Sequence, residues 1–322
     1  MIDDLSKSMR ILSMFDRLSK GEILSKVEEA NRFGVVEKTI QRDIADLRTY
    51  ISETYGHAMR IEYNRKKQGY ILKKDKSLWF QNEEILSISK VLIESRAFNK
   101  EEMNQLIGKL LNQCEPDSKK LIKDTINNEL FHYSELMHKK KIMSTLWELS
   151  NAVRTKTKVR IHYKPNAQYT VKRTIRPMGV IFSEFYFYLV AYNDKKAEPD
   201  LIPYRIDRIE TYKILNERFR VNYNERFEEG RFRKQVQFMY AGELLKIELK
   251  CHYLALEAVL DRLPTARVVE NQQNFAIVEA EVYGEGVVMW LLSQAHRVEV
   301  LKPASLRMMM KEKIYKMNKL YE

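Results

Sequence analysis

Cysteine is scarce in this sequence, with only Cys114 and Cys251 among 322 residues. Two cysteines so far apart are too few for a disulfide framework and lack the spacing of a thiolate metal site. We therefore expect two buried free thiols, which behave as small apolar side chains. The histidines indicate no metal site either, because His132 and His138 do not share a helix face as an i, i+4 pair of ligands does. The sequence thus predicts no bound metal.

Long apolar runs are absent too. Stretches such as residues 287 to 292 fall far short of the roughly 20 residues that a membrane-spanning helix needs. The N-terminus carries Asp3 and Asp4 and lacks the apolar core of a signal peptide. With 44% hydrophobic and 31% charged residues, the composition is that of a soluble globular protein. We expect a cytoplasmic protein with no membrane partner.

Signatures of catalysis are missing as well. There is no phosphate loop ending in Gly-Lys-Ser or Gly-Lys-Thr, and Gly284-Glu285-Gly286 lacks the third glycine and the strand-helix context of a dinucleotide loop. No nucleophile elbow or Ser/His/Asp arrangement is apparent, and no clustered Asp/Glu/His site supports a nuclease. We therefore predict that the protein is not an enzyme and needs no cofactor.

What the sequence has instead is length and positive charge. A chain of 322 residues exceeds the roughly 250 to 300 at which a single hydrophobic core stops growing, so we expect roughly two to four domains. The net charge is +12 and the isoelectric point is near 9.4. Clustered Lys and Arg gain free energy by releasing counterions from phosphate backbones, so a polyanionic partner is favoured.

The pattern of apolar residues predicts an α+β multidomain fold in five segments. Helical periodicity gives way to a two-residue period at residues 59 to 74 and then returns, and aromatic and β-branched residues alternate with polar ones from about residue 158. The segments are a three-helix and hairpin unit (1–75), a helical connector (76–155), a small β-barrel (156–220), a basic linker or short helix (221–242) and a small α+β domain (243–322).

Residues 22 to 51 carry the sharpest local pattern. Two apolar stripes of helical spacing flank Gly34, and Val35 is the small apolar residue between them. The first stripe is Ile23, Val27, Ala30 and Phe33, and the second is Ile40, Ile44, Leu47 and Ile51. This pattern indicates a helix-turn-helix.

The second of these helices turns DNA-reading residue types away from its apolar stripe. Arg42 can form a bidentate hydrogen bond with a guanine edge, and Gln41 can pair with adenine or a phosphate. Lys38 and Thr39 suit phosphate oxygens or a thymine methyl. The hairpin that follows is basic, with Glu62 as its only acidic residue. A merely solvated polar face is the alternative, because most helices have one. We predict DNA contacts from Lys38, Thr39, Gln41, Arg42, Arg65, Lys66 and Lys67.

The string FGVVEKTIQRDIADL, followed by RKKQGYIL, resembles the winged helix-turn-helix of WYL-domain transcription regulators. The matching residues are Thr39, Ile40, Arg42, Asp43, Ile44, Leu47, Gly69 and Tyr70. Position 36 departs from the family, which usually has a serine there as the helix N-cap. Val36 has no side-chain oxygen to cap with, and the loss of such a cap costs about 1 kcal/mol.

Residues 156 to 220 hold 14 Lys and Arg against 7 Asp and Glu. Within them, RTIRPMGVIFSEFYFYLVAYN and YRIDRIE resemble the WYL domain itself, with Phe187-Tyr188-Leu189 in place of the family's Trp-Tyr-Leu triplet. The resemblance implies an Sm-like barrel whose basic face binds a nucleotide or single-stranded nucleic acid. The ligand-facing residues that it implies are types that grip phosphates and stack on bases: Tyr163, Arg173, Tyr188, Arg205 and Arg208.

Structural roles compete with this interpretation of the basic segment. Tyr188 is equally consistent with a core aromatic residue. Arg205 and Arg208 have acidic neighbours in Asp207 and Glu210, and internal ion pairs with them are the alternative to ligand binding. Ion pairs of this kind at a surface contribute only about 0–1 kcal/mol.

The stretch VVMWLLSQAHRVEVLKPASLRMMM resembles the WCX extension that follows WYL domains. The matching residues are Trp290, Pro303, Leu306 and Arg307. Together the three resemblances cover about three quarters of the chain in the family's order, and only the helical connector is unspecific.

These features predict a sequence-specific transcription regulator that binds a double-stranded operator and senses a nucleotide-like effector. Helix-turn-helix proteins commonly read two half-sites, so a homodimer is expected, with residues 76–155 as transmitter and dimer surface. Effector binding would shift the population of dimer geometries and so the spacing of the reading helices. The alternative is a single-strand-sensing accessory subunit of a nucleic-acid-processing or phage-defence system.

Overall fold

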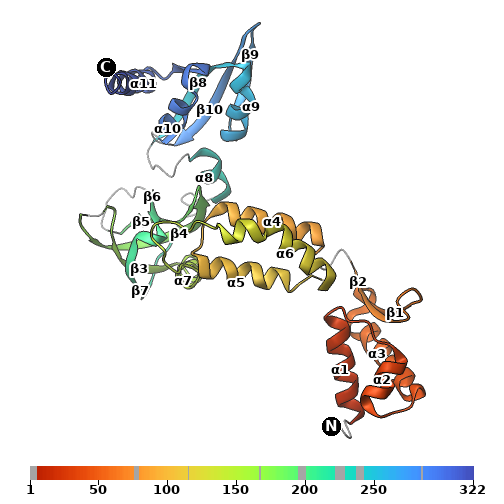
Figure 1. Ribbon diagram of the computed structural model, residues 1–322. Helices are drawn as coiled ribbons and strands as arrows, with labels where there is room; N and C mark the ends of the chain where they lie inside the picture. The colour runs from red at the N-terminus through yellow and green to blue at the C-terminus, as the bar shows by residue number, and fades with distance from the viewer. Residues whose placement is uncertain are drawn as a thin grey trace. The chain divides into compact units, whose positions relative to one another are not determined.

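A computed structural model describes the chain at residues 6–75, 80–114, 116–166, 168–194, 201–221, 229–236, 243–283 and 286–322. The fold is α+β, as predicted, with its helices and strands labelled in Figure 1. The chain divides into two compact units, Met1–Lys139 and Lys140–Glu322. The division falls inside the predicted connector of 76–155, and most of the predicted linker at 221–242 lies outside the described residues. Within those ranges, no helix is both long and apolar enough for a membrane span.

The first unit opens with three helices, a short 3-10 turn and a hairpin. Their bounds are α1 (Lys7–Ser19), α2 (Lys26–Phe33), α3 (Glu37–Tyr55), η1 (Gly56–Ala58), β1 (Met59–Asn64) and β2 (Gly69–Lys74). They share one core, which includes Met14, Leu18, Leu24, Ile40, Ile44, Leu47 and Ile51. Gly34 ends α2 with a φ of 62°, in the left-handed region that glycine adopts without strain. Val36 precedes α3 and provides no side-chain cap, as predicted.

The first predicted apolar stripe is wrong at one position. Val27, which the predicted stripe placed in the core, is 53% exposed. Leu24, which the stripe left out, is buried in its place. The reason is that α2 begins only at Lys26, so the residues before it are extended. There, Leu24 pairs with Tyr70 in an antiparallel bridge through backbone hydrogen bonds of 2.8 and 3.0 Å.

Three further helices complete the first unit, in the region where a helical connector was predicted. They are α4 (Asn82–Ser95), α5 (Lys100–Leu111) and α6 (Pro116–Phe131). They pack on one another, with Ile85, Met103, Ile107 and Ile126 buried (Figure 1). Asn99 caps α5 by accepting a hydrogen bond from the backbone N–H of Glu102. The break between α5 and α6 lies where the sequence places Pro116.

The second unit begins with α7 (Met143–Arg154) and a five-stranded antiparallel sheet. The strands are β3 (Thr157–Tyr163), β4 (Val171–Ser183), β5 (Tyr186–Asn193), β6 (Leu201–Arg205) and β7 (Ile209–Arg218), with the 3-10 turn η2 (Ile206–Arg208) before β7. The order in the sheet is β6-β5-β4-β3-β7. The predicted alternation is present in β3, where Val159, Ile161 and Tyr163 are buried. Helix α7, which lies within the predicted connector, packs Leu149 and Ala152 into this core.

The rest of the second unit alternates strands and helices, as predicted. The short helix α8 (Glu229–Gln235) precedes β8 (Leu244–His252), α9 (Tyr253–Arg262), β9 (Arg267–Asn271), β10 (Phe275–Tyr283), α10 (Gly286–Ser293), η4 (Ala295–Arg297), β11 (Val298–Lys302) and α11 (Ala304–Asn318). The sheet order β11-β8-β10-β9, with antiparallel neighbours throughout, makes a split β-α-β arrangement. Its core is formed by one face of the sheet and by residues such as Val259, Leu263, Leu291 and Leu306.

Candidate nucleic-acid interface and effector site

The outer face of α3 presents the predicted reading residues to solvent. Lys38, Gln41 and Arg42 are exposed and Thr39 is half-buried, while Ile40 and Ile44 on the opposite face are buried. Positions 38, 41 and 42 are three and four residues apart, so their side chains neighbour one another on the helix surface. Across the part of the chain that the structure describes, neither Lys38, Gln41 nor Arg42 makes a side-chain hydrogen bond or ion pair. These side chains are therefore available to a ligand.

Buried ion pairs fix α3 and α2 on α1. The Arg10 Nε donates to Asp43 Oδ2 at 2.5 Å, and both side chains are almost fully buried. The Arg17 guanidinium donates to both carboxylate oxygens of Glu29 at 2.6 and 2.7 Å and to Glu22 at 2.6 Å. Burial opposes the charge of Arg17, but these hydrogen bonds raise its pKa above the ordinary value. Sequence reasoning found Asp43 only as a family match and missed Arg10; a carboxylate one position from a core isoleucine was the available signal.

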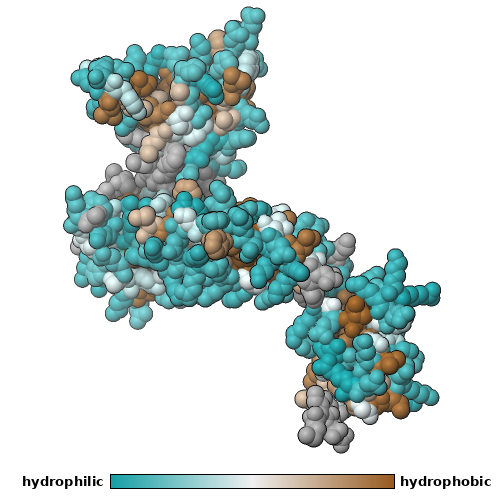
Figure 2. All heavy atoms as spheres, in the orientation of Figure 1, coloured by the Kyte–Doolittle hydropathy of each residue, from teal (hydrophilic) through white to brown (hydrophobic). Residues whose placement is uncertain are grey.

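The hairpin between β1 and β2 carries the second predicted group of cations. The backbone N–H groups of Lys66 and Lys67 donate to Asn64 Oδ1 at 3.0 and 3.1 Å and close the turn. The side chains of Arg65, Lys66 and Lys67 are exposed at the tip, and Figure 2 shows hydrophilic residues over this end of the hairpin. The acidic residue, Glu62, lies nearer the base of the hairpin and pairs there with Arg60 and Lys73 at 2.6 and 2.8 Å. Positive charge therefore concentrates at the tip.

Close backbone contacts attach the hairpin to the helices. Arg48 of α3 donates to the Ile61 carbonyl at 3.1 Å, and its guanidinium lies over the Tyr70 ring at 5.5 Å. Gly69 sits so close to the segment before α2 that an added Cβ would lie 2.5 Å from Ile23 Cγ2 and 3.0 Å from the Leu24 carbonyl oxygen. Sequence reasoning missed Arg48, because its two partners come from the hairpin and only folding brings them together.

The predicted effector residues gather at the β6–η2 end of the second-unit sheet, with Tyr163 and Arg173 on the face that holds Tyr204, and Tyr188 and Arg205 on the opposite face. The Arg205 backbone N–H donates to the Tyr163 hydroxyl at 3.4 Å, and the Tyr163 and Tyr204 rings meet edge to face at 5.0 Å. Arg173 donates to the Tyr204 hydroxyl at 3.1 Å. Tyr188 faces Arg205 directly across the β5–β6 ladder. Tyr204, which begins the YRIDRIE string but was not among the predicted site residues, is the residue that joins Arg173 to Tyr163.

The arginines of this cluster are held by internal partners. Arg205 donates from Nε and Nη2 to the two carboxylate oxygens of Asp207 at 3.1 and 2.7 Å, and its guanidinium lies 3.4 Å from the centre of the Tyr186 ring. The internal ion pair weighed as the alternative for Arg205 is therefore present. Arg208 does not pair with Glu210; it donates to the Pro165 carbonyl at 2.7 Å. The Arg205 side chain, 18% exposed, is fixed in place before any ligand arrives.

Burial shapes the acid-base properties of the tyrosines. Desolvation raises the pKa of Tyr163, against the opposing effect of Arg205 and Arg208, and it raises the pKa of Tyr188. Both hydroxyls therefore stay protonated at neutral pH and can donate or accept hydrogen bonds. The cluster combines neutral phenols with fixed guanidinium groups, which suits a ligand that carries both a phosphate and a flat ring.

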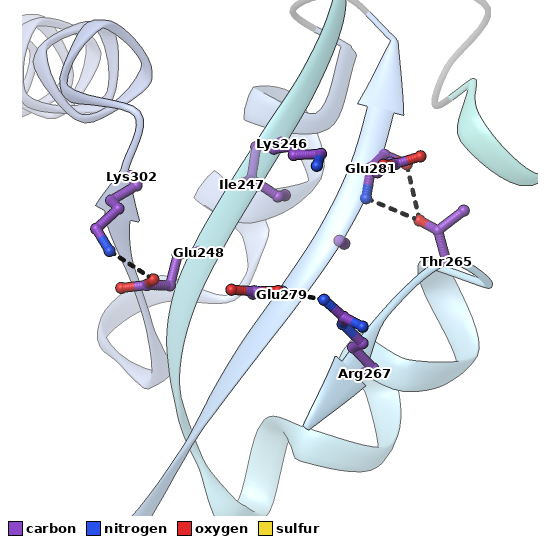
Figure 3. A pocket seen from close by; sticks show the side chains of 9 residues that line it. Lys246, Ile247, Glu248, Thr265, Arg267, Glu279, Glu281 and Lys302 are labelled. Atoms are coloured by element: carbon purple, nitrogen blue, oxygen red, sulfur yellow. Dashed lines mark hydrogen bonds and ion pairs between the residues drawn. The ribbon is translucent and has the colours of Figure 1, made fainter. Parts of the chain in front are cut away.

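A hollow of about 460 Å³ lies on the outer face of the C-terminal sheet, away from the predicted site residues. Its charged side chains pair across the strands (Figure 3), with Lys302 bonded to Glu248 and Arg267 bonded to Glu279, both at 2.8 Å. Thr265 donates to the Glu281 carbonyl at 2.7 Å. Most polar groups of the hollow thus already have partners within the sheet.

The two cysteines differ in burial. Cys251 is buried, and burial raises the pKa of its thiol to about 11, whereas Cys114 is only half-buried. The expectation of two buried thiols therefore holds for Cys251 alone. Among the described residues, no three His, Cys, Asp or Glu side chains gather as a metal site would require.

Comparison with known proteins identifies one domain. Residues 144–214 match the family model described as the WYL domain, which confirms the predicted WYL domain and includes α7 in it. Two solved structures are similar in part: the proteasome accessory factor B/C of Arthrobacter aurescens (TM-score 0.31, 15% identity, 95% of this chain and 47% of that one) and a CRISPR Cas-related protein (TM-score 0.36, 13% identity, 100% and 88%). The chain spans about half the length of the Arthrobacter aurescens protein. No curated protein matches the chain.

Proposed function

We propose that this WYL-domain chain is a sequence-specific transcription regulator without enzymatic activity. Residues 1–75 act as a winged helix-turn-helix that binds a double-stranded operator, and the WYL domain, an Sm-like barrel, binds a nucleotide or single-stranded nucleic acid as effector. Residues 76–155 connect the two and form the dimer surface, and residues 243–322 are the WCX extension. The regulator acts as a homodimer in the cytoplasm.

One observation carries the DNA-binding proposal: the distribution of partners among the arginines of residues 6–75. Arg10, Arg17, Arg48 and Arg60 have hydrogen-bond or ion-pair partners, and Arg32 lies over the Phe33 ring. Within this described range, only Arg42 on α3 and Arg65 at the hairpin tip have none. In this range, an exposed arginine without a partner on α3 and another at the hairpin tip support the assignment of α3 as the reading helix and of the hairpin as the wing.

The exposed residues of α3 and those of the hairpin tip would make different contributions to DNA binding. Exposed side chains near the N-terminal end of a recognition helix reach base edges in the major groove, where Arg pairs with guanine and Gln with adenine. A basic wing contacts phosphates and gives affinity without sequence information. The proposed regulator therefore reads sequence through Arg42 and Gln41 and gains salt-dependent affinity through Arg65, Lys66 and Lys67.

A binding-site selection followed by titration of the selected duplex tests this division. Arg42→Ala is expected to weaken binding to the selected site by about 1–3 kcal/mol and to relax its sequence preference. Replacing Arg65, Lys66 and Lys67 with Gln is expected to weaken all sequences alike and to flatten the dependence of log K on log salt by about 0.9 per lost phosphate contact. Lys20→Ala, which removes an exposed cation directly after α1 that pairs with Asp16, is the matched control and should bind as the wild type does.

The same titration separates the two candidate functions. Unchanged sequence selectivity in Arg42→Ala would remove the reading-helix assignment. A chain that binds single strands but selects no duplex sequence would instead favour the accessory subunit of a nucleic-acid-processing system, which the Tyr and Arg cluster of the WYL domain by itself supports equally well.

A further inference from the structure

Helix α8 packs against both sheets of the second unit. Toward the WYL-domain sheet, Phe232 and Val236 form a buried cluster with Ile181 and Val190, and Tyr188 and Leu201 pack against it. Ile181, Tyr188 and Arg205 are direct neighbours across β4, β5 and β6, so they share one face of the sheet. Tyr188 therefore touches the α8 cluster and lies next to Arg205 of the effector cluster.

Toward the C-terminal sheet, α8 contacts the last residues of β10. The Phe232 and Tyr283 rings lie 5.8 Å apart at an angle of 35°, and Val236 forms a parallel backbone bridge with Tyr283. Gln235, which is only 4% exposed, donates from Nε2 to Glu281 at 3.4 Å. Glu281 also lines the hollow of the C-terminal sheet (Figure 3). A single helical turn thus connects Tyr188 with residues 281–283.

A second contact between the sheets is electrostatic. Arg262 at the end of α9 donates to Glu184 in the β4–β5 turn at 2.6 Å. Both side chains are about one-third exposed, at 30% and 35%, so solvent screens the pair and it contributes little. The apolar contact through α8 is therefore the stiffer of the two connections, because buried side chains are close-packed and do not move independently.

We infer that α8 transmits occupancy of the effector cluster to the C-terminal sheet: a ligand that moves Arg205 or Tyr188 repacks Phe232, and Phe232 moves Tyr283 at the end of β10. This regulatory role rests on the proposed effector site, because ligand binding there starts the change. The packing that couples Tyr188 to Tyr283 is present without a ligand. The C-terminal domain is then the first element to respond to the sensor.

Hydrogen exchange on the full chain without ligand tests the coupling directly. Tyr188→Ala is expected to speed exchange at residues 229–236 and 281–283 by roughly threefold or more, because it removes packing that α8 needs. The matched control is Tyr212→Ala on β7, at the opposite edge of the sheet, whose ring packs against the core that includes Leu149; it should leave residues 281–283 unchanged. Faster exchange at β5 and β6 with wild-type rates at 281–283 in Tyr188→Ala would overturn the inference.

A conservative variant guards against loss of the fold. Phe232→Leu keeps an apolar side chain on α8 and lies outside the effector cluster, so the chain should keep its secondary structure by circular dichroism. It is expected to speed exchange at residues 281–283 as Tyr188→Ala does. Wild-type exchange at 281–283 in this variant would also contradict a connection through Phe232.

A second arm adds a probe, 5′-phosphorylated single-stranded hexathymidylate, and follows its binding by fluorescence anisotropy. The wild type should bind the probe and show slower exchange at 281–283, whereas Phe232→Leu should bind within roughly twofold and show no such response. Binding without any response at 281–283 in the wild type would overturn the coupling and leave the effector site intact. If the probe does not bind, the proposed effector chemistry fails, and the ligand-free variants decide the coupling.

Discussion

At the scale of single residues, two arginines of the first unit have opposite roles, because one has a buried ionic partner and the other has none in the part of the chain that the structure describes. Arg10 is buried against Asp43, and Arg42, one residue before Asp43 in the sequence, is exposed with no partner among the described residues. A buried guanidinium needs its carboxylate, since an unpaired buried charge is far costlier than an exposed one. The structure therefore separates arginines that hold the fold from arginines that are free to bind.

Removing the buried carboxylate should destabilise the first unit strongly. Asp43→Ala leaves Arg10 buried without a counterion, which is expected to cost about 3–5 kcal/mol. Asp46→Ala is the matched control, because Asp46 joins the same two helices through an exposed pair with Lys7 at 2.7 Å, which solvent screens and which contributes little to stability. Hydrogen exchange in α1 and α3 reports the difference, and equal protection in the two variants would contradict it.

At the scale of elements, the hairpin depends on Gly69 because no side chain fits between it and the segment before α2. Gly69→Ala is expected to cost about 1–3 kcal/mol, because the new Cβ would overlap Ile23 Cγ2 and crowd the Leu24 carbonyl that accepts from Tyr70. Exchange at β2 and a drop in DNA affinity are the measurements. Gly108→Ala in α5 has open space and should instead stabilise its helix by about 0.5–1 kcal/mol. Intact β2 protection in Gly69→Ala would refute the close approach.

In the WYL domain, the segment from β6 to η2 carries the arginines of the proposed effector site. Arg208 contributes a guanidinium beside Tyr163, so Arg208→Ala is expected to weaken binding of the 5′-phosphorylated hexathymidylate by roughly tenfold, or about 1.4 kcal/mol. Arg160→Ala is the control, since Arg160 is exposed on β3, away from the cluster. Titration by fluorescence anisotropy measures both. Equal losses in the two variants would mean that the cluster contributes only diffuse positive charge.

At the scale of the whole molecule, the proposal requires two copies of the chain on one operator. A single reading helix covers few base pairs, and helix-turn-helix proteins gain specificity by binding two half-sites about one helical turn or its multiples apart. Analytical ultracentrifugation is expected to give a dimer, and footprinting of the selected site should give two protected half-sites with that spacing. A monomer that protects a single half-site would contradict the homodimer.

Much of the fold was predictable because periodicity records which face of an element is buried. The stripe of Ile40, Ile44, Leu47 and Ile51 predicted α3, and the alternation around Val159 and Ile161 predicted β3. The exposed positions of α3 are those on the face opposite this stripe, and for this reason the prediction that Lys38, Gln41 and Arg42 are exposed is confirmed. The start of α2 was misjudged, because Leu24 is held by a hydrogen-bonding partner 46 positions later in the chain, Tyr70.

The amino-acid sequence alone determined the order of helices and strands, the excess of positive charge, the polar face of α3 and the presence of a WYL domain. Only the tertiary structure decided that Asp207 holds Arg205, that Tyr204 joins Arg173 to Tyr163, and that α8 contacts both Tyr188 and Tyr283. The physical reason is range. Burial patterns repeat within a few residues, whereas most of these hydrogen bonds and ring contacts join segments distant in the sequence, whose proximity exists only once the chain has folded.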